Sequence, residues 1–225
     1  RSPARYKPPV RPGGLVQVRA HCADGKAQRI EVENLPSFVV LLSKNTFHQA
    51  QPLYDRLWGS GFLPSRHQGV RLRGTGAPVL YLDNPPGVSR TTRRQIIDDV
   101  NAMNHLRLKE DENPELSTRI SQYELAFRMQ ESVPEITETR DEPARTWKLY
   151  GEDARHRGSY AANCLQARRL LERGVRFVHV LAPHPHNSWD HHGDINNKLP
   201  GMCRRTDLPS AGLIRDLKQR GLLDE

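Results

Sequence analysis

Five of the ten histidines lie in one short segment, from His179 to His192, beside the carboxylate of Asp190. The five are His179, His184, His186, His191 and His192. Imidazole nitrogens and carboxylate oxygens are suitable ligands for zinc, manganese and related divalent ions. The segment follows a predicted helix and a predicted buried strand, and open α/β sheets place their sites at the carboxyl ends of strands. The residue types and their position therefore predict a functional site in this loop.

The centre of the predicted site is the run from Asp190 to Gly193. Asp190 and His192 are two residues apart, so in an extended segment their side chains point to the same side, whereas His191 points to the other. Gly193 permits a tight turn after them. We predict that Asp190, His192 and His191 contribute to a divalent metal site. The alternative is that they are surface histidines of a polar loop anchored by Trp189.

Other polar residues have weaker functional interpretations. His184 and His186 could be further metal ligands, although a solvated rigid loop fits this Pro-containing stretch better. His179 alternates with apolar neighbours and is interpreted as a satisfied core histidine. Arg71 and Arg73 could bind an anion, although a solvated strand edge is the simpler interpretation.

The positive charge is concentrated at the amino-terminal end. Residues 1–30 hold seven Lys or Arg residues and one Asp, and so carry +6 of the formal net charge of +8. A basic face on the folded body is therefore not expected, and we expect no nucleic-acid binding by it. No apolar run is long enough to span a bilayer. Cys22, Cys164 and Cys203 form no Cys-x-x-Cys pair, and Cys164 is expected in the core.

Three apolar patterns predict strands. Alternation around Asp24-Gly25 predicts a hairpin over residues 16–32. The continuous apolar runs at residues 37–42 and 175–181 predict buried strands. Residues 78–82 are a further short candidate. Residues 43–78 show no sustained period and are interpreted as an excursion that packs on the sheet through Tyr54, Trp58 and Phe62.

Helical spacing and capping residues predict four helices. In the first, Thr91 or Thr92 is the predicted cap, and the predicted buried stripe is Ile96, Val100, Met103 and Leu106. The second begins at Pro114 and ends before Pro134. The third is capped by Ser159 and ends at Gly174. The last begins at Asp207, and residues 134–158 are predicted to be polar and irregular.

Several segments resemble one bacterial family. They are Asn34–Leu41, Gln51–Arg66, Ile120–Glu124, Phe127–Gln130, Ser132–Glu135, Ala162–Leu165, Arg173–Val178, Trp189–Gly193 and Asp216–Asp224. Together they resemble the sulfatase-like proteins called domain of unknown function 1501, from about Asn34 to Glu225. This resemblance gives two expected parts: a basic, Pro- and Gly-rich arm with a possible hairpin at residues 1–33, unlike the family, and a partial sulfatase- or phosphatase-like domain at residues 34–225.

The resemblance implies a branch of the alkaline phosphatase-like superfamily. The implied fold class is α/β, an α/β/α sandwich with a mostly parallel sheet. The implied activity is metal-dependent hydrolysis of sulfate or phosphate esters, in which one or two metals activate the nucleophile and stabilise developing charge. The aspartate and histidine of the Trp-Asp-x-His-Gly motif correspond to Asp190 and His192, and His191 occupies a more variable place. The metal could be zinc, manganese, calcium or magnesium.

The chain departs from the family pattern at both ends. Residues 1–32 do not resemble the upstream region expected to hold the nucleophile, and the downstream strand, loop and further ligands are absent. We therefore expect a fragment that is truncated at both ends and inactive by itself. An anionic ester is the expected substrate of the full-length relative. Export is suggested by the family, although this chain has no signal peptide and no initiator Met.

Two alternatives belong to other functional classes. A protein of the same fold could bind an anionic polysaccharide or surface component without catalysis. A third possibility is an interaction protein that works through its basic arm, whose binding should then fall steeply with salt.

Overall fold

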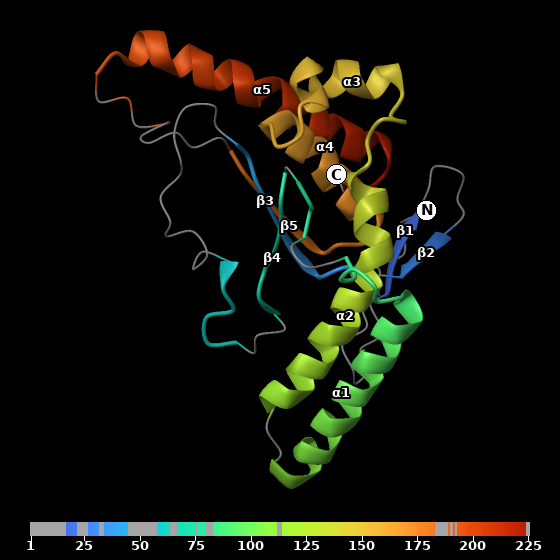
Figure 1. Ribbon diagram of the computed structural model, residues 1–225. Coiled ribbons are helices and arrows are strands. Elements are labelled where there is room, and N and C mark those ends of the chain that lie inside the picture. Colours follow the sequence, from blue (N-terminus) through green and yellow to red (C-terminus); the bar gives the residue numbers. More distant parts are fainter. Residues whose placement is uncertain are drawn as a thin grey trace, which may run out of the picture.

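The computed structural model describes residues 17–21, 27–31, 34–44, 58–63, 67–74, 76–79, 83–111, 114–182, 189, 191 and 193–223. The strands are β1 (Gln17–His21), β2 (Ala27–Glu31), β3 (Phe38–Leu42), β4 (Val70–Leu72) and β5 (Phe177–Leu181). The helices are α1 (Arg90–Asp111), α2 (Pro114–Thr137), α3 (Ala144–Tyr150), the 3₁₀ helix η4 (Glu152–Arg155), α4 (Tyr160–Glu172) and α5 (Ile195–Gln219). Figure 1 shows α3, α4 and α5 gathered at one end of the molecule.

The sheet that positions the site is parallel and has the order β4-β3-β5. In its register, Val39 of β3 lies between Val70 of β4 and Val178 of β5. Val39 and Val40 are fully buried, as expected for a continuous apolar strand in a parallel sheet. The mixed α/β class and both predicted strands are confirmed, and β3 is buried as predicted. The predicted burial of β5 is wrong, because Phe177 is 57% exposed and the other four residues of the strand are only half-buried at this edge of the sheet. Residues 78 and 79 form a bend rather than a strand, and residues 80–82 lie outside the described residues.

The predicted amino-terminal hairpin is also confirmed. Strands β1 and β2 pair antiparallel, with Gln17 opposite Glu31 and His21 opposite Ala27. The predicted Asp24-Gly25 turn lies outside the described residues.

Helix α4 begins and ends as its sequence predicts. The hydroxyl of Ser159 accepts a hydrogen bond from the Ala162 N–H at 2.9 Å, which caps the first turn. Gly174 has a φ of 82°, and the N–H of Val175 donates to the Leu170 carbonyl at 3.1 Å. This pattern satisfies the last carbonyls of the helix and turns the chain into β5.

The core forms where α4 packs on β3 and β5, with smaller contributions from α2 and α3. Leu165 and Leu170 are fully buried. Cys164 is buried as predicted, and burial raises the pKa of its thiol to about 12.

The prediction of irregular structure over residues 134–158 is wrong. Helix α2 continues through Pro134 to Thr137, and α3 and η4 follow within the same stretch. Val133 and Ile136 are fully buried on either side of Pro134, so their packing maintains a helix that lacks one backbone hydrogen bond. Trp147 and Tyr150 of α3 are buried against neighbouring elements, a tertiary contact that the local pattern did not reveal.

The predicted start of the last helix at Asp207 is also wrong. Helix α5 begins at Ile195 and includes both Pro200 and Pro209. Met202, Thr206 and Pro209 are buried at spacings of four and three residues, so one continuous face packs on the body. This packing outweighs the hydrogen bonds that the two prolines remove.

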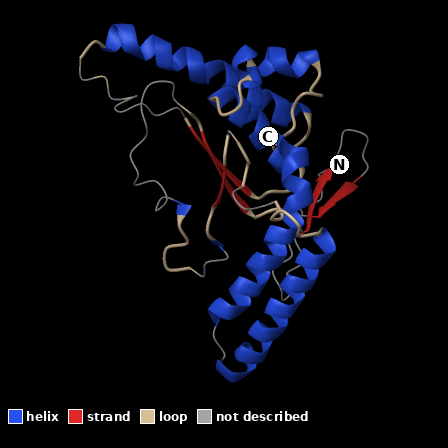
Figure 2. Ribbon diagram, in the orientation of Figure 1, coloured by secondary structure: helices blue, strands red, loops and turns tan. Residues whose placement is uncertain are grey.

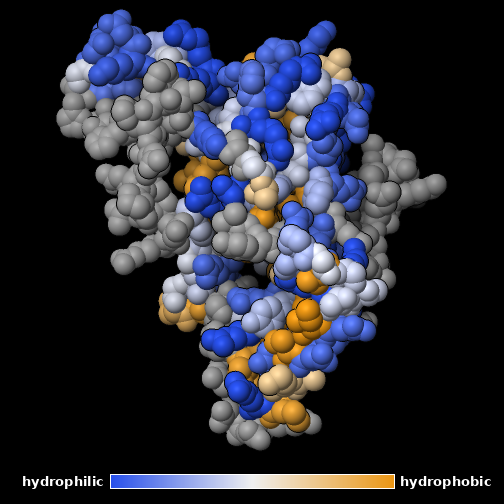
Figure 3. Space-filling model, viewed as in Figure 1, coloured by the Kyte–Doolittle hydropathy of each residue, from blue (hydrophilic) through white to orange (hydrophobic). Residues whose placement is uncertain are grey.

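Helices α1 and α2 form a hairpin that extends away from the sheet (Figure 2). The predicted cap and buried stripe of α1 are wrong. Ser89 caps the helix by accepting from the Thr92 N–H at 3.0 Å. Much of the predicted stripe is exposed, with Met103 at 61% and Leu106 at 64%, and apolar surface is visible on the hairpin in Figure 3.

The polar residues of α1 explain why its other face meets α2. The guanidinium of Arg94 donates to both Glu124 oxygens, at 2.9 and 2.5 Å, and the Asn101 amide donates to the same carboxylate at 2.8 Å. Ile97 is buried on this face. The helix orientation is therefore set by a carboxylate on α2, which hydrophobic periodicity does not detect.

Of the three aromatic residues predicted to pack on the sheet from residues 43–78, one of the two that the structure describes is buried. Trp58 is buried, whereas Phe62 is 98% exposed, so its predicted packing on the sheet is wrong. Phe62 lies in a turn closed by a 3.0 Å bond from the Leu63 N–H to the Ser60 carbonyl, which holds its side chain in solvent. Tyr54 lies outside the described residues. No helix in the described ranges is long and apolar enough to cross a membrane.

Candidate functional site at the carboxyl edge of the sheet

The carboxyl ends of β3, β4 and β5 lie at one edge because the three strands are parallel. Two consecutive residues after β3 connect this edge to its surroundings. The Ser43 N–H donates to the carbonyl of Leu181, where the His-rich loop begins, at 3.2 Å. The Lys44 N–H donates to the carbonyl of Gly158, just before α4, at 2.7 Å. The exit of β3 is therefore joined on one side to the His-rich loop and on the other to the amino end of α4.

A buried amide stabilises the centre of this edge. Asn163 of α4 is 1% exposed, and its Nδ2 donates to the hydroxyl of Ser43 at 3.0 Å. The side chain reaches this point because Ser159 fixes the first turn of α4 directly before it. The sequence analysis did not identify Asn163 as a site residue, since a single Asn in an amphipathic helix carries no motif.

The structure describes part of the predicted metal loop. Asp190 and His192, like His184 and His186, lie outside the described residues. Of the three predicted ligands, His191 is described. Its Nε2 is shielded from solvent and has no hydrogen-bond partner within the described ranges. Trp189 is 47% exposed.

The loop ends in a sharp turn into α5. Asp194 adopts a left-handed conformation, with a φ of 67° and a ψ of 38°, and precedes the first residue of α5. Its carboxylate accepts a hydrogen bond from the Asn197 amide at 2.5 Å. The turn places His191 close to the amino end of a long helix.

The donor chemistry of His191 is compatible with a metal, although the predicted ligand set is not complete in the described part of the chain. A neutral imidazole that keeps one nitrogen unpaired can coordinate a divalent ion through it. Among the described residues, no group of three or more His, Cys, Asp or Glu side chains could hold a metal ion. The metal site at Asp190, His191 and His192 stays a prediction.

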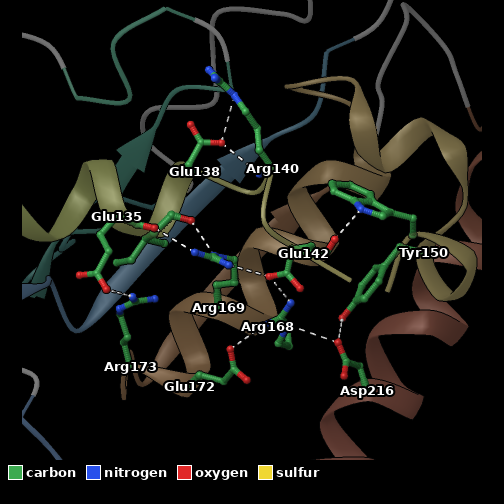
Figure 4. Close-up of polar contacts among 12 residues, drawn as sticks. Glu135, Glu138, Arg140, Glu142, Tyr150, Arg168, Arg169, Glu172, Arg173 and Asp216 are labelled. Carbon is green, nitrogen blue, oxygen red and sulfur yellow. Dashed lines mark hydrogen bonds and ion pairs between the residues drawn. The ribbon is translucent and has the colours of Figure 1, made fainter. Parts of the chain in front are cut away.

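A buried ionic network stabilises the helices beside this edge (Figure 4). Arg168 of α4, with a side chain 4% exposed, contacts Glu142 at 2.6 Å, Glu172 at 2.6 Å and Asp216 at 3.2 Å. The Tyr150 hydroxyl donates to Asp216 at 3.0 Å, and burial raises the pKa of Tyr150, so the phenol stays a neutral donor. The network joins α3, α4 and α5 and thereby stabilises the helix that carries Asn163.

A second polar feature of the edge involves Arg73, for which the sequence gives anion binding as an alternative to a solvated strand edge. Arg73 and Arg157 line one small recess together with Gln166 of α4. Sequence analysis did not connect these residues, because they belong to separate loops and a helix. Both arginines precede a glycine, but Arg-Gly also occurs at 173–174 and 220–221, so this dipeptide does not identify the pair.

The comparisons with known proteins identify the family and no solved relative. No solved structure matched this chain. A family model described as "Protein of unknown function (DUF1501)" matches residues 23–225. This match covers most of the chain and includes the sheet, the His-rich loop and every described helix. The chain therefore belongs to the DUF1501 family.

Proposed function

We propose that this chain is part of a metal-dependent hydrolase of sulfate or phosphate esters, with an alkaline phosphatase-like α/β/α sandwich as its complete fold. The observation that supports it most is the start of the His-rich loop at the carboxyl end of β5, an edge strand of the parallel sheet β4-β3-β5. The carboxyl ends of such strands are where open α/β sheets bind ligands.

The unpaired Nε2 of His191 supports a coordinating role for this loop. A shielded imidazole nitrogen without a partner is unfavourable unless a ligand satisfies it. Asp190 and His192 flank it and would provide the other two protein ligands. When bound, a divalent ion would activate a nucleophile and stabilise negative charge on the ester oxygens.

The first experiment measures metal binding by the full chain. The chain is stripped with EDTA, and Zn²⁺, Mn²⁺, Ca²⁺ and Mg²⁺ are titrated separately by calorimetry. We expect binding of at least one of these ions, and Asp190→Ala, His191→Ala and His192→Ala should each weaken it by about tenfold or more. His156→Ala is the matched control, because His156 is an exposed histidine outside the loop.

Unchanged metal affinity in all three loop variants would overturn the proposed ligand set. Hydrolysis is tested separately on the longest native form of the protein, with nitrophenyl sulfate and nitrophenyl phosphate and each metal. Absence of ester hydrolysis under all these conditions would refute the hydrolase. Polyanion binding that is independent of metal and unaffected by Asp190→Ala would instead favour the non-catalytic alternative.

A further inference from the structure

Two arginine–glycine pairs meet at the β4 side of the carboxyl edge. Arg73-Gly74 follows β4, and Arg157-Gly158 follows η4. A Cβ added to Gly74 would lie 2.5 Å from the Cα of Gly158, so the two backbones touch where neither residue has a side chain. Gly158 also has a φ of 86°, which favours glycine. This close contact places the two preceding arginines at one recess.

The recess is lined by cations and hydrogen-bonding groups. Besides the two arginines, its lining includes Thr139 and Gln166, and no Asp or Glu of the described residues contributes to it. The carbonyl of Gly158 accepts a hydrogen bond from the Lys44 N–H. Ala162 and Gln166 also line the recess, which therefore lies beside the first two turns of α4. The positive end of that helix adds to the favourable potential for an anion.

Neither arginine has an ion-pair partner in the part of the chain that the structure describes. This differs from Arg94, Arg168 and Arg220, which all contact carboxylates at 2.5 to 2.6 Å. Glu138 interacts electrostatically with Arg157: the pKa of its carboxyl is lowered mainly by the backbone N–H of Arg140, and Arg157 makes a minor contribution. The Glu138 carboxylate is instead directed to Arg140, and it accepts a hydrogen bond from the backbone N–H of Arg140 at 3.0 Å (Figure 4).

Inside the recess, a buried donor is unsatisfied. The Nε2 of Gln166 is shielded from solvent and has no hydrogen-bond partner among the described residues. A buried N–H without an acceptor costs folding free energy, which an acceptor entering the recess would recover. Arg73 and Arg157 are exposed, so water solvates their guanidiniums when no ligand is bound. Together with the unpaired amide they favour one kind of ligand, a group with several acceptor oxygens and negative charge.

We propose that this recess binds a tetrahedral oxyanion, phosphate or sulfate, either free or at the end of a monoester. Gln166 satisfies an oxygen at the bottom, and Arg73 and Arg157 neutralise the charge at the opening. The enclosed space of about 20 Å³ accommodates one oxygen-sized group. The remainder of a larger ligand must therefore lie outside, which excludes a buried diester.

The test measures phosphate and sulfate binding to the full, EDTA-treated chain by calorimetry at low salt. We expect Arg73→Gln and Arg157→Gln each to weaken binding by about tenfold, the effect of losing one charge-assisted hydrogen bond. Glu138→Gln should strengthen binding, because it removes a carboxylate that interacts electrostatically with Arg157. Arg176→Gln is the matched control, since Arg176 is an exposed arginine before β5, at the opposite edge of the sheet.

Two further measurements specify the site and the source of the anion. The side-chain amide signal of Gln166 in ¹⁵N–¹H spectra should shift on phosphate addition and should shift much less in Arg73→Gln at a phosphate concentration near the wild-type Kd. Phenyl phosphate should bind about as well as phosphate, whereas dimethyl phosphate should bind weakly. Unchanged affinity in both arginine variants, or an unshifted Gln166 signal, would overturn the proposal. Because metal is absent throughout, the result does not depend on the proposed metal loop.

Discussion

At the scale of single residues, Glu142 shows how burial and ion pairing combine. Its side chain is 6% exposed, and one of its oxygens accepts from Arg168 and Arg169, both at 2.6 Å. Burial alone would raise the pKa of this carboxyl, but the two guanidiniums outweigh that effect and hold the pKa below its ordinary value of 4.5. Because the pKa of Glu142 is lower in the folded state than in the unfolded state, its ionised form stabilises the fold. This contribution is complete at a pH above the unfolded-state pKa and is lost as the pH falls through the folded-state pKa.

We predict that Glu142→Gln lowers the free energy of unfolding at pH 7 by about 2–3 kcal/mol, because Arg168 loses a charged partner inside the protein. The variant should also lose less stability than the wild type as pH falls from 4.5 through the lower folded-state pKa. Urea denaturation at a series of pH values measures both effects. The control is Glu152→Gln, an exposed carboxylate whose removal should change stability little. Equal losses in the two variants would contradict the role of the network.

At the scale of elements, α5 contains two glycines with opposite surroundings. A Cβ on Gly212 would lie 2.5 Å from the backbone oxygen of Leu149, because α5 crosses the end of α3 at this point. A Cβ on Gly201 in the same helix would meet nothing within 4 Å. Gly212 is therefore required by packing, and Gly201 is not.

Gly212→Ala and Gly201→Ala form a matched pair with opposite expected signs. We predict that Gly201→Ala raises the free energy of unfolding by about 0.5–1 kcal/mol, since alanine is the better helix former. Gly212→Ala should lower it by about 1–3 kcal/mol, because backbone atoms of α3 must move. Thermal and urea unfolding give both values. If Gly212→Ala also stabilises the protein, α3 and α5 are not packed as described.

At the scale of the whole molecule, the sheet with α4 forms the packed centre, and the α1–α2 hairpin projects from it (Figure 1). The main contact of α1 is with α2, and several of its large apolar side chains are exposed. Stability in such a structure is expected to vary by region, since local opening needs less free energy where few buried contacts are broken.

We predict that hydrogen exchange separates these regions. Amides of β3 and α4 should exchange slowest, with opening free energies close to global stability, and those of α1 should exchange much faster. Mass spectrometry of peptic fragments resolves the two groups within one sample, so each acts as the control for the other. Equal protection of α1 and α4 would show that the hairpin unfolds together with the body.

Local signals in the sequence determined the elements that need no distant partner. The apolar runs specified β3 and β5, and Ser159 and Gly174 specified both ends of α4. The point where the His-rich loop leaves the sheet followed from the end of β5. These features depend on propensities and hydrogen bonds between near neighbours in the chain.

Only the tertiary structure decided the features that depend on distant residues. Helix α5 continues through two prolines because one face of it is buried, and α1 turns Ile97 rather than Met103 inward because Glu124 lies on α2. Arg73 and Arg157 meet because two glycines from separate loops touch. The physical reason is common to all three: burial and charge pairing are set by which surfaces meet, and local periodicity contains no information about a partner far along the chain.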